Sequence, residues 1–283
     1  MKTRIKTMQR TARRVAIALV LCTGAACAQT PPPAGGDGTA LSAEQAAFAD
    51  ELARRTFDYF WETTDPDDCL APDRWPSAPF SSIAATGFAL TAYGIGAERG
   101  FVTRAAAADR TLRCLEVYRD LPQGPQAEGV AGHKGFFYHF LDMEDGTRHR
   151  TTELSSVDTS LLFAGVLFAQ SYFDRDDPVE QAIRETADAL YRRADWTFFL
   201  RGADDAPAAN LPESKGLAMG WKPEIGFESH DWVGYNEGML IYVLALGSPT
   251  HPVTREAWDE GWAARLDEEW KTYYGYEHLN FEP

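Results

Sequence analysis

Three carboxylates of the sequence stand where acid–base chemistry is possible. Glu237 comes directly before the apolar run 238–246, and Glu153 and Asp158 lie together in ELSSVDT, at the start of another apolar run. Two carboxyl groups, one protonated and one ionised, can protonate a leaving group and activate a water. Each can also be a structural carboxylate, because a helix N-terminus stabilises negative charge. Position alone leaves both interpretations open.

Polar and aromatic residues gather in the same parts of the chain. This mixture suits a neutral carbohydrate, because aromatic rings stack on sugar C–H faces and carboxylates accept hydrogen bonds from paired hydroxyls. For any one charged residue, a solvated charge or a salt bridge is the competing interpretation. The residues that we expect to contact such a ligand are Asp73, Arg74, His133, Lys134, Asp142, Lys222, Trp232 and Tyr235.

Other kinds of site lack support in the sequence. There is no G-x-S-x-G, H-E-x-x-H or C-x-x-C motif, which disfavours serine-hydrolase and zinc chemistry. His133 and His139 flank the start of an expected strand at 136–142, and hydrogen-bonding or core roles fit them better than metal ligation. We therefore predict no metal and no cofactor.

Helices of two kinds must position these residues. Amphipathic segments begin near 42, 103, 177 and 254, and nearly uniformly apolar segments rich in small residues occupy 81–96, 156–170 and 237–247. A helix that is apolar all round has to be buried, and its glycines are tolerable where neighbouring helices approach closely. The expected buried faces of the first and last amphipathic segments are Phe48, Leu52, Thr56 and Tyr59, and Trp258, Trp262 and Leu266.

The order of these segments predicts an all-α array of helical hairpins with about seven helices. The apolar inner helices start near 81, 156 and 236, spacings of 75 and 80 residues. Links from an inner to an outer helix are short, whereas the links 63–80, 121–155 and 201–235 are long. In antiparallel hairpins, all three long links emerge on the rim that bears the N-termini of the inner helices. Ordered loops on such a scaffold often carry functional residues.

The N-terminus predicts export to the periplasm or the extracellular space. Basic residues precede the apolar run VAIALVLC and a small-residue stretch, so residues 1–28 are a predicted signal peptide and 29–41 a flexible spacer. Cleavage after Ala28 leaves a soluble chain, and cleavage before Cys27 leaves a lipid anchor. We expect no membrane span in the mature chain. Cys69 and Cys114 can pair or remain buried thiols, and we favour thiols.

The charge balance bears on the partners. Six of the 27 Lys and Arg lie in the predicted signal peptide, which leaves 21 against 42 Asp and Glu, a net charge of −21. Such a surface repels phosphate backbones and anionic lipids. Nucleic acid and anionic membranes are therefore disfavoured as partners, and a neutral oligo- or polysaccharide is favoured.

Long stretches of the sequence resemble the glycoamylase-like domain family, which includes enzymes acting on β-1,2-glucans. The likeness runs from about Leu52 to the end of the chain and corresponds to the N-terminal part of family members. The matching segments are FDYFWETTDP, PDRWP, SSIAATGFALTAYGIGAERG, GHKGFFYHFLDM, ELSSVDTSLLFAGVLFAQ, ADWTFF, MGWKPE and GYNEGMLIYVLALGSPTHP.

The resemblance implies an (α/α)6 toroid and an exported glycoside hydrolase that acts on a glucan, β-1,2-glucan being the first candidate. It also implies that Glu153, Asp158 and Glu237 line the sugar cleft. We assign Glu237 as the general acid and expect Glu153 and Asp158 to orient sugar hydroxyls or a water.

One departure from the family bears on activity. A closed toroid has six inner helices and three are predicted here, so the glycoamylase-like domain at 42–283 is expected to be truncated at its C-terminus. Three explanations stay open. The gene or its model is interrupted, a second polypeptide completes the ring, or the chain is a glycan-binding module without hydrolysis.

Overall fold

The computed structural model describes residues 41–201 and 215–280. The predicted signal peptide, its cleavage site at Cys27 or Ala28, and nearly all of the predicted spacer lie outside the described residues. The chain divides into a first unit, 1–46, and a second unit, 47–283, which contains the features discussed below. Within the described residues, no helix has both the length and the apolar character needed to cross a bilayer.

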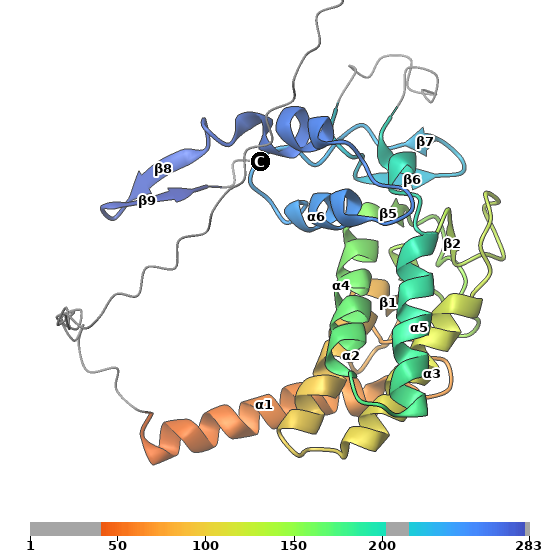
Figure 1. Cartoon of the computed structure of the whole chain (residues 1–283), viewed down its shortest axis with the longest axis vertical. Helices are drawn as coiled ribbons and strands as arrows, with labels where there is room; N and C mark the ends of the chain where they lie inside the picture. Colours follow the sequence, from red (N-terminus) through yellow and green to blue (C-terminus); the bar gives the residue numbers. More distant parts are fainter. Residues whose placement is uncertain (1–40, 202–214, 281–283) are drawn as a thin grey trace, which may run out of the picture. The chain divides into compact units, whose positions relative to one another are not determined.

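The predicted alternation of outer and inner helices is confirmed. The three inner helices of the described chain are α2 (Ile83–Glu98), α4 (Ser156–Tyr172) and α6 (Met239–Gly247), and α4 packs against both others. The outer helices α3 (Arg104–Asp120) and α5 (Pro178–Arg193) pack against each other and each against its inner partner (Figure 1). This is the helical-hairpin packing that the sequence predicts, and it is of the (α/α)6-toroid type that the family resemblance implies. The first helix, α1, spans Ala43–Thr63.

Small residues bring the first two inner helices into backbone contact. A Cβ atom added at Gly165 of α4 would lie 2.1 Å from the carbonyl oxygen of Gly87 in α2. A Cβ atom at Gly87 would lie 2.4 Å from the carbonyl oxygen of Leu161. Neither position has space for a side chain, because real Cβ atoms do not approach other atoms so closely. The expectation that glycines serve close helix packing is confirmed at this crossing.

Short strands tie the long loops together next to the inner helices. β1 (Ser81–Ser82), directly before α2, pairs with β4 (Phe140–Leu141) of the second long loop. β5 (Leu154–Ser155), directly before α4, pairs with β6 (Gly220–Lys222) of the third, which continues to β7 (Gly226–Phe227). The three long loops therefore meet on one rim, at the N-termini of α2 and α4 (Figure 1).

Two further antiparallel hairpins complete the strands of the described residues. β2 (Gly132–His133) pairs with β3 (Phe136–Phe137) within the second long loop. β8 (Trp270–Tyr273) pairs with β9 (Tyr276–Leu279) near the end of the chain. The single strand expected at 136–142 is wrong, because β3 and β4 have different partners and residues 138 and 139 lie between them.

The two predicted amphipathic faces differ from the structure. In α1, Phe48 and Leu52 are 68% and 54% exposed and Phe57 is the buried residue, because the first half of the helix makes a surface ion pair, Asp50–Arg99, which leaves its apolar side chains uncovered. The last helix expected from residue 254 is irregular, with a π-helical turn at Ala257–Gly261 and a 3-10 turn at Trp262–Arg265. A second 3-10 turn, Trp196–Phe199, follows α5.

The two described cysteines form a disulfide, which corrects the expectation of free thiols. Cys69 of the first long loop bonds to Cys114 of the outer helix α3, and both are fully buried. The bond closes a segment with a sequence separation of 45 residues. By restricting the unfolded chain, such a crosslink stabilises a fold by about 2–4 kcal/mol. It anchors the first long loop to the helical scaffold beneath the rim.

Candidate active site

A histidine joins two of the three predicted catalytic carboxylates. Nδ1 of His139 lies 2.7 Å from Oε1 of Glu153, at hydrogen-bonding distance. Nε2 of the same ring lies 3.4 Å from Oδ1 of Asp158, which makes an ion pair when the ring is protonated. The three side chains are 30%, 25% and 14% exposed, so the cluster is accessible from solvent yet largely surrounded by protein. We call these residues the acid–histidine cluster.

Backbone contacts of the rim fix the position of His139. Its N–H donates to the carbonyl oxygen of Glu153 at 2.9 Å, and its own carbonyl oxygen accepts from the N–H of Ile83 at 3.3 Å. The imidazole stacks on the ring of the next residue, Phe140, with centroids 3.8 Å apart. The position of the imidazole is therefore restrained jointly by the second long loop, which carries Glu153 and Phe140, and by the start of α2.

The start of α4 fixes Asp158. Ser155 is the N-cap of the helix, and its Oγ accepts the N–H of Asp158 at 3.1 Å. The same hydroxyl donates to Oδ2 of Asp158 at 2.6 Å. Ser155 thus satisfies one of the free N–H groups at the helix N-terminus and orients the carboxylate at the same time. The other oxygen, Oδ1, remains directed toward His139.

Proton affinities in the cluster follow from these contacts. Burial lowers the pKa of His139, but the hydrogen bond to Glu153 and the charges of Asp158, Glu153 and Asp73 outweigh it, so the pKa lies above its ordinary value of 6.5. Burial raises the pKa of Glu153, but the hydrogen bond to His139, a backbone hydrogen bond and the charges of His139 and Lys222 together outweigh it, so the pKa lies below 4.5. The arrangement favours an imidazolium beside an ionised carboxylate.

The same residue types can ligate metals, and their geometry bears on that option. One donor atom from each residue lies within 4.8 Å of the others. A metal site would need one ring nitrogen and both carboxylates to face a common point. Here Nδ1 faces Glu153 and Nε2 faces Asp158, so each nitrogen already has its own acidic partner. This arrangement fits a hydrogen-bonded bridge better than a metal centre.

Residues of the neighbouring loops surround the cluster. Lys222 of β6 pairs with Glu228 at 3.4 Å, and a Cβ atom added at Gly220 would lie 2.9 Å from Cγ of Glu153. Glu153 and Glu228 therefore lie on the same side of β6, beside the one position of the strand that has no side chain.

The first long loop adds charge and an aromatic surface. Asp73 pairs with Arg74 at 2.7 Å, and the Arg74 guanidinium lies 5.5 Å from the centre of the Phe80 ring. Phe80 in turn packs on Phe140, the ring under His139, with centroids 4.3 Å apart. A continuous row of side chains thus leads from Asp73 to the acid–histidine cluster.

Glu237, the predicted general acid, is exposed on the third long loop. Its carboxylate has no hydrogen-bonding or ionic partner among the described residues. The loop is nevertheless held to the start of α4, because Nε1–H of Trp232 donates to Oγ of Ser156 at 3.1 Å. Asn236 accepts the N–H of Gly238, the residue before α6. Glu237 is therefore placed on the rim that bears Asp158.

The remaining predicted ligand contacts lie in other surroundings. His133 packs between Phe198 and Trp221, and Lys134 pairs with Asp195 after α5. Asp142 caps a turn by accepting the N–H of Glu144 and lies 3.5 Å from His149. The Tyr235 side chain is exposed, and its N–H donates to Glu269. The structure therefore brings Asp73, Arg74 and Lys222 toward the cluster, and holds His133, Lys134, Asp142 and Tyr235 by other contacts.

His139 is the main residue that sequence reasoning did not place at this site, although a hydrogen-bonding role was among those expected for it. Its only signal was the motif FFYHFLD, in which a polar residue interrupts an aromatic run. Phe80 was also missed, because it has no distinctive neighbour in the sequence.

Comparison with known proteins supports the predicted relationship. The family model Glycoamylase, described as "Putative glucoamylase", matches residues 229–283. The chain is 28% identical over 226 residues to an exo β-1,2-glucooligosaccharide sophorohydrolase (non-reducing end) from Parabacteroides distasonis. The resemblance to the glycoamylase-like domain family is confirmed.

Two solved structures extend this glycoamylase-like resemblance to the fold. A "putative glucoamylase" from Bacteroides uniformis matches 86% of the chain with a TM-score of 0.71 and 28% identity. A β-1,2-glucanase from Parabacteroides distasonis matches 83% with a TM-score of 0.64 and 25% identity. The match covers 56% of the Bacteroides uniformis chain and 34% of the β-1,2-glucanase. The alignment with the sophorohydrolase covers 76% of this chain and 28% of that protein, so this chain spans only part of the length of its relatives.

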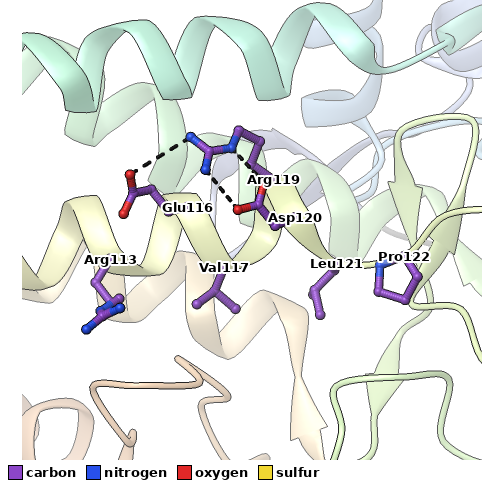
Figure 2. A pocket seen from close by; sticks show the side chains of 7 residues that line it. All are labelled: Arg113, Glu116, Val117, Arg119, Asp120, Leu121 and Pro122. Carbon is purple, nitrogen blue, oxygen red and sulfur yellow. Dashed lines mark hydrogen bonds and ion pairs between the residues drawn. The ribbon is translucent and has the colours of Figure 1, made fainter.

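A surface hollow on the outer layer of the glycoamylase-like array is a different kind of feature. Figure 2 shows it at the end of α3, where Arg119 turns toward Glu116 and Asp120 while Val117 and Leu121 lie on the other side. Arg119 and Asp120 form an ion pair at 2.8 Å, so each charge already has a partner. The hollow shares no residue with the acid–histidine cluster, and it has no comparable set of acid–base groups.

Proposed function

We propose that the chain contributes the sugar cleft of an exported glycoside hydrolase that acts on a glucan, with β-1,2-glucan as the substrate. The observation that carries the proposal is the acid–histidine cluster on the rim where the long loops of a glycoamylase-like helical array meet. Two relatives are named for hydrolysis of β-1,2-linked glucans. The excess of acidic residues disfavours anionic polymers as the substrate.

The geometry favours a division of roles among the carboxylates. The imidazole of His139 fills the space between Glu153 and Asp158, so these two cannot be the pair that flanks a glycosidic bond. We assign them to binding sugar hydroxyls or a water. Glu237 is assigned as the general acid, because it lies on the same rim and no described side chain forms a hydrogen bond or ion pair with its carboxylate.

Further residues are proposed to position the sugar. Asp73, Arg74 and Lys222 lie around the cluster with charges that can bind hydroxyls, and Trp232 offers a half-buried aromatic surface beside α4. His133, Lys134, Asp142 and Tyr235 stay predicted contacts for more distant parts of a glucan chain. No metal or cofactor is needed for the proposed chemistry.

The proposed location is outside the cytoplasm. The sequence features of a signal peptide at 1–28 and the buried Cys69–Cys114 disulfide support it, since disulfides persist in oxidising compartments. A lipid anchor on Cys27 is the alternative to soluble export.

A second polypeptide that completes the ring is proposed as the chain's protein partner. Apolar side chains of the first and last described inner helices support it. Exposed members of this set are Phe88, Ile95, Met239, Val243 and Leu246. Contiguous exposed apolar surface commonly marks an interface.

The assignment of Glu237 predicts a specific loss of activity. In a chain that hydrolyses β-1,2-glucooligosaccharides, Glu237→Gln should lower kcat about 10²- to 10⁴-fold, because it removes the proton donor. The measurement is release of reducing ends, with Glu260→Gln as a control at another exposed glutamate without a described partner. Near-normal turnover by Glu237→Gln would refute the assignment. Saturable glucan binding without turnover by the unmodified chain would instead indicate a glycan-binding module.

A further inference from the structure

We propose that His139 is a positioning residue that, as an imidazolium between the two side chains, holds the carboxylates of Glu153 and Asp158 as one unit in the sugar cleft. The inference rests on the proposed function for its role in catalysis, but the coupling of the three side chains can be tested without turnover.

The first argument is the direction of the ring nitrogens. Nδ1 faces Oε1 of Glu153 at 2.7 Å and Nε2 faces Oδ1 of Asp158 at 3.4 Å. A neutral imidazole has one N–H and one lone pair, so one nitrogen would direct its lone pair at a carboxylate oxygen. The imidazolium has an N–H on both nitrogens and interacts favourably with both partners. The geometry therefore selects the charged form.

The second argument is that the ring has little freedom to choose other partners. Both backbone polar groups of His139 are hydrogen-bonded to rim segments, and Phe140 covers one face of the imidazole. The carboxylates are also restrained, Asp158 by Ser155 and Glu153 by its contact with the backbone of β6 at Gly220. A ring held between two restrained carboxylates transmits its position to both of them.

The third argument concerns the charges that face the ring. Glu153 precedes β5, Asp158 belongs to α4, and Asp73 comes from the first long loop, so three acidic groups act on His139. Lys222 from β6 also acts on Glu153. Without the imidazolium, Glu153 and Asp158 would be neighbouring like charges that repel each other. The imidazolium places a positive charge between the two carboxylates, which draws both of them toward the ring.

The test is a pH titration of the histidine ring signals by NMR, in the unmodified chain and in variants. The His139 signal is identified by its loss in His139→Gln. We expect His139 to titrate at higher pH than an ordinary histidine. Glu153→Gln should shift its midpoint to lower pH, and Asp158→Asn should do so by less, because its contact is longer. His278→Gln, at a histidine of the exposed strand β9, should leave the His139 midpoint unchanged.

Several results would overturn the inference. One is a His139 midpoint at or below 6.5, the ordinary value, in the unmodified chain. Another is a midpoint that does not respond to Glu153→Gln, or to Asp158→Asn if the first variant does not fold. A third is stoichiometric binding of added Zn²⁺ that is lost in His139→Gln, which would make the cluster a metal site.

Hydrolysis separates this inference from the proposed function. In an active chain, His139→Gln should lower kcat/KM about 10- to 100-fold, the range typical of residues that orient a functional side chain. Its pH–rate profile should also change on the acidic limb, which a loss of fold alone would not produce. An inactive chain with the expected titration would refute glucan hydrolysis and leave the coupling intact. An active chain with an ordinary His139 titration would refute the coupling alone.

Discussion

The imidazole of His139 makes the residues around it dependent on one another. Its pKa is raised mainly by the hydrogen bond to Glu153, against the opposing effect of burial, and the pKa of Glu153 is lowered by the same bond. A group whose pKa differs between the folded and the unfolded chain also contributes to stability, because the folded chain stabilises one of its ionisation states. The pair should therefore stabilise the fold over a limited range of pH.

The direction of each shift defines that range. The contribution of His139 is present below its ordinary pKa of 6.5 and is lost as the pH rises through the raised value. The contribution of Glu153 is present above its ordinary value of 4.5 and is lost as the pH falls through the lowered value. The free energy of unfolding should thus differ most between the unmodified chain and His139→Gln at pH 4.5–6.5. Urea unfolding across pH measures this, and a difference that grows in alkaline solution would contradict it.

At this scale the sequence predicts the carboxylates better than their partner. Glu153, Asp158 and Glu237 stand out because each lies beside an apolar helical run. His139 lies in the second long loop and Asp158 in the first turn of α4, and the backbone bond between His139 and Glu153 brings the histidine to the cluster. Strand pairs of two residues leave no periodic pattern in the sequence. The contact between His139 and Glu153 could therefore not be predicted from spacing.

At the scale of elements, two of the rim strands are continuous with the helices α2 and α4, which cross in contact. Ser82 and Ser155 cap these two helices, and β1 and β5 end at the same residues. A change in the distance between the helices would therefore move β4 and β6, which pair with those strands. The glycines at the crossing are thus connected to the geometry of the cluster as well as to stability.

Alanine at the α2–α4 crossing should destabilise the chain. Gly165→Ala gains up to about 1 kcal/mol of helix propensity. It also forces a methyl group toward the carbonyl oxygen of Gly87, 2.1 Å away, and overpacking of this kind costs about 1–3 kcal/mol. The net effect should be a lower midpoint of urea unfolding.

Gly247→Ala is the matched control for this prediction. The added methyl group would lie 3.6 Å from the Tyr191 hydroxyl, an ordinary contact, so this variant should be neutral or more stable. Equal midpoints for Gly165→Ala and the unmodified chain would show that the two helices are not held at this distance.

The sequence predicts the helical elements more reliably than their ends and irregularities. The inner helices are evident because they combine apolar side chains with glycine and alanine. The π-helical turn at Ala257–Gly261 could not be foreseen, because the Trp258–Trp262 spacing also fits a regular helix. In the structure, a Cβ atom added at Gly261 would lie 3.0 Å from Cα of Gly216. This close approach joins residues that are distant in sequence.

At the scale of the whole molecule, the described chain leaves apolar faces on its inner helices. Met239, Val243 and Leu246 follow one side of α6, and Phe88 and Ile95 follow one side of α2. Residues at these spacings share one face of a helix. Their burial was predicted from the apolar character of the helices, and the described neighbours cover the other faces. What covers these faces depends on partners that sequence periodicity does not reveal.

The exposed face of α6 predicts self-association of the isolated chain. Val243→Lys with Leu246→Lys should shift the chain toward monomer, because the two lysines make this surface polar. Size-exclusion chromatography with light scattering over a range of concentrations measures the effect. Ser171→Lys with Gln181→Lys is the control, since it adds the same charge at exposed positions of α4 and α5. A chain that is already monomeric at all concentrations would contradict this prediction.

The central claim is that the rim formed by the long loops binds a glucan at the acid–histidine cluster. The most direct test is to titrate a β-1,2-glucooligosaccharide into the labelled chain and to follow the NMR signals of its histidine rings and tryptophan indoles. The account predicts saturable changes at His139 and Trp232, with none at His278 of the β8–β9 hairpin, which contributes no residue to the cluster. Saturable binding that leaves His139 and Trp232 unchanged, or no binding of the oligosaccharide, would contradict it.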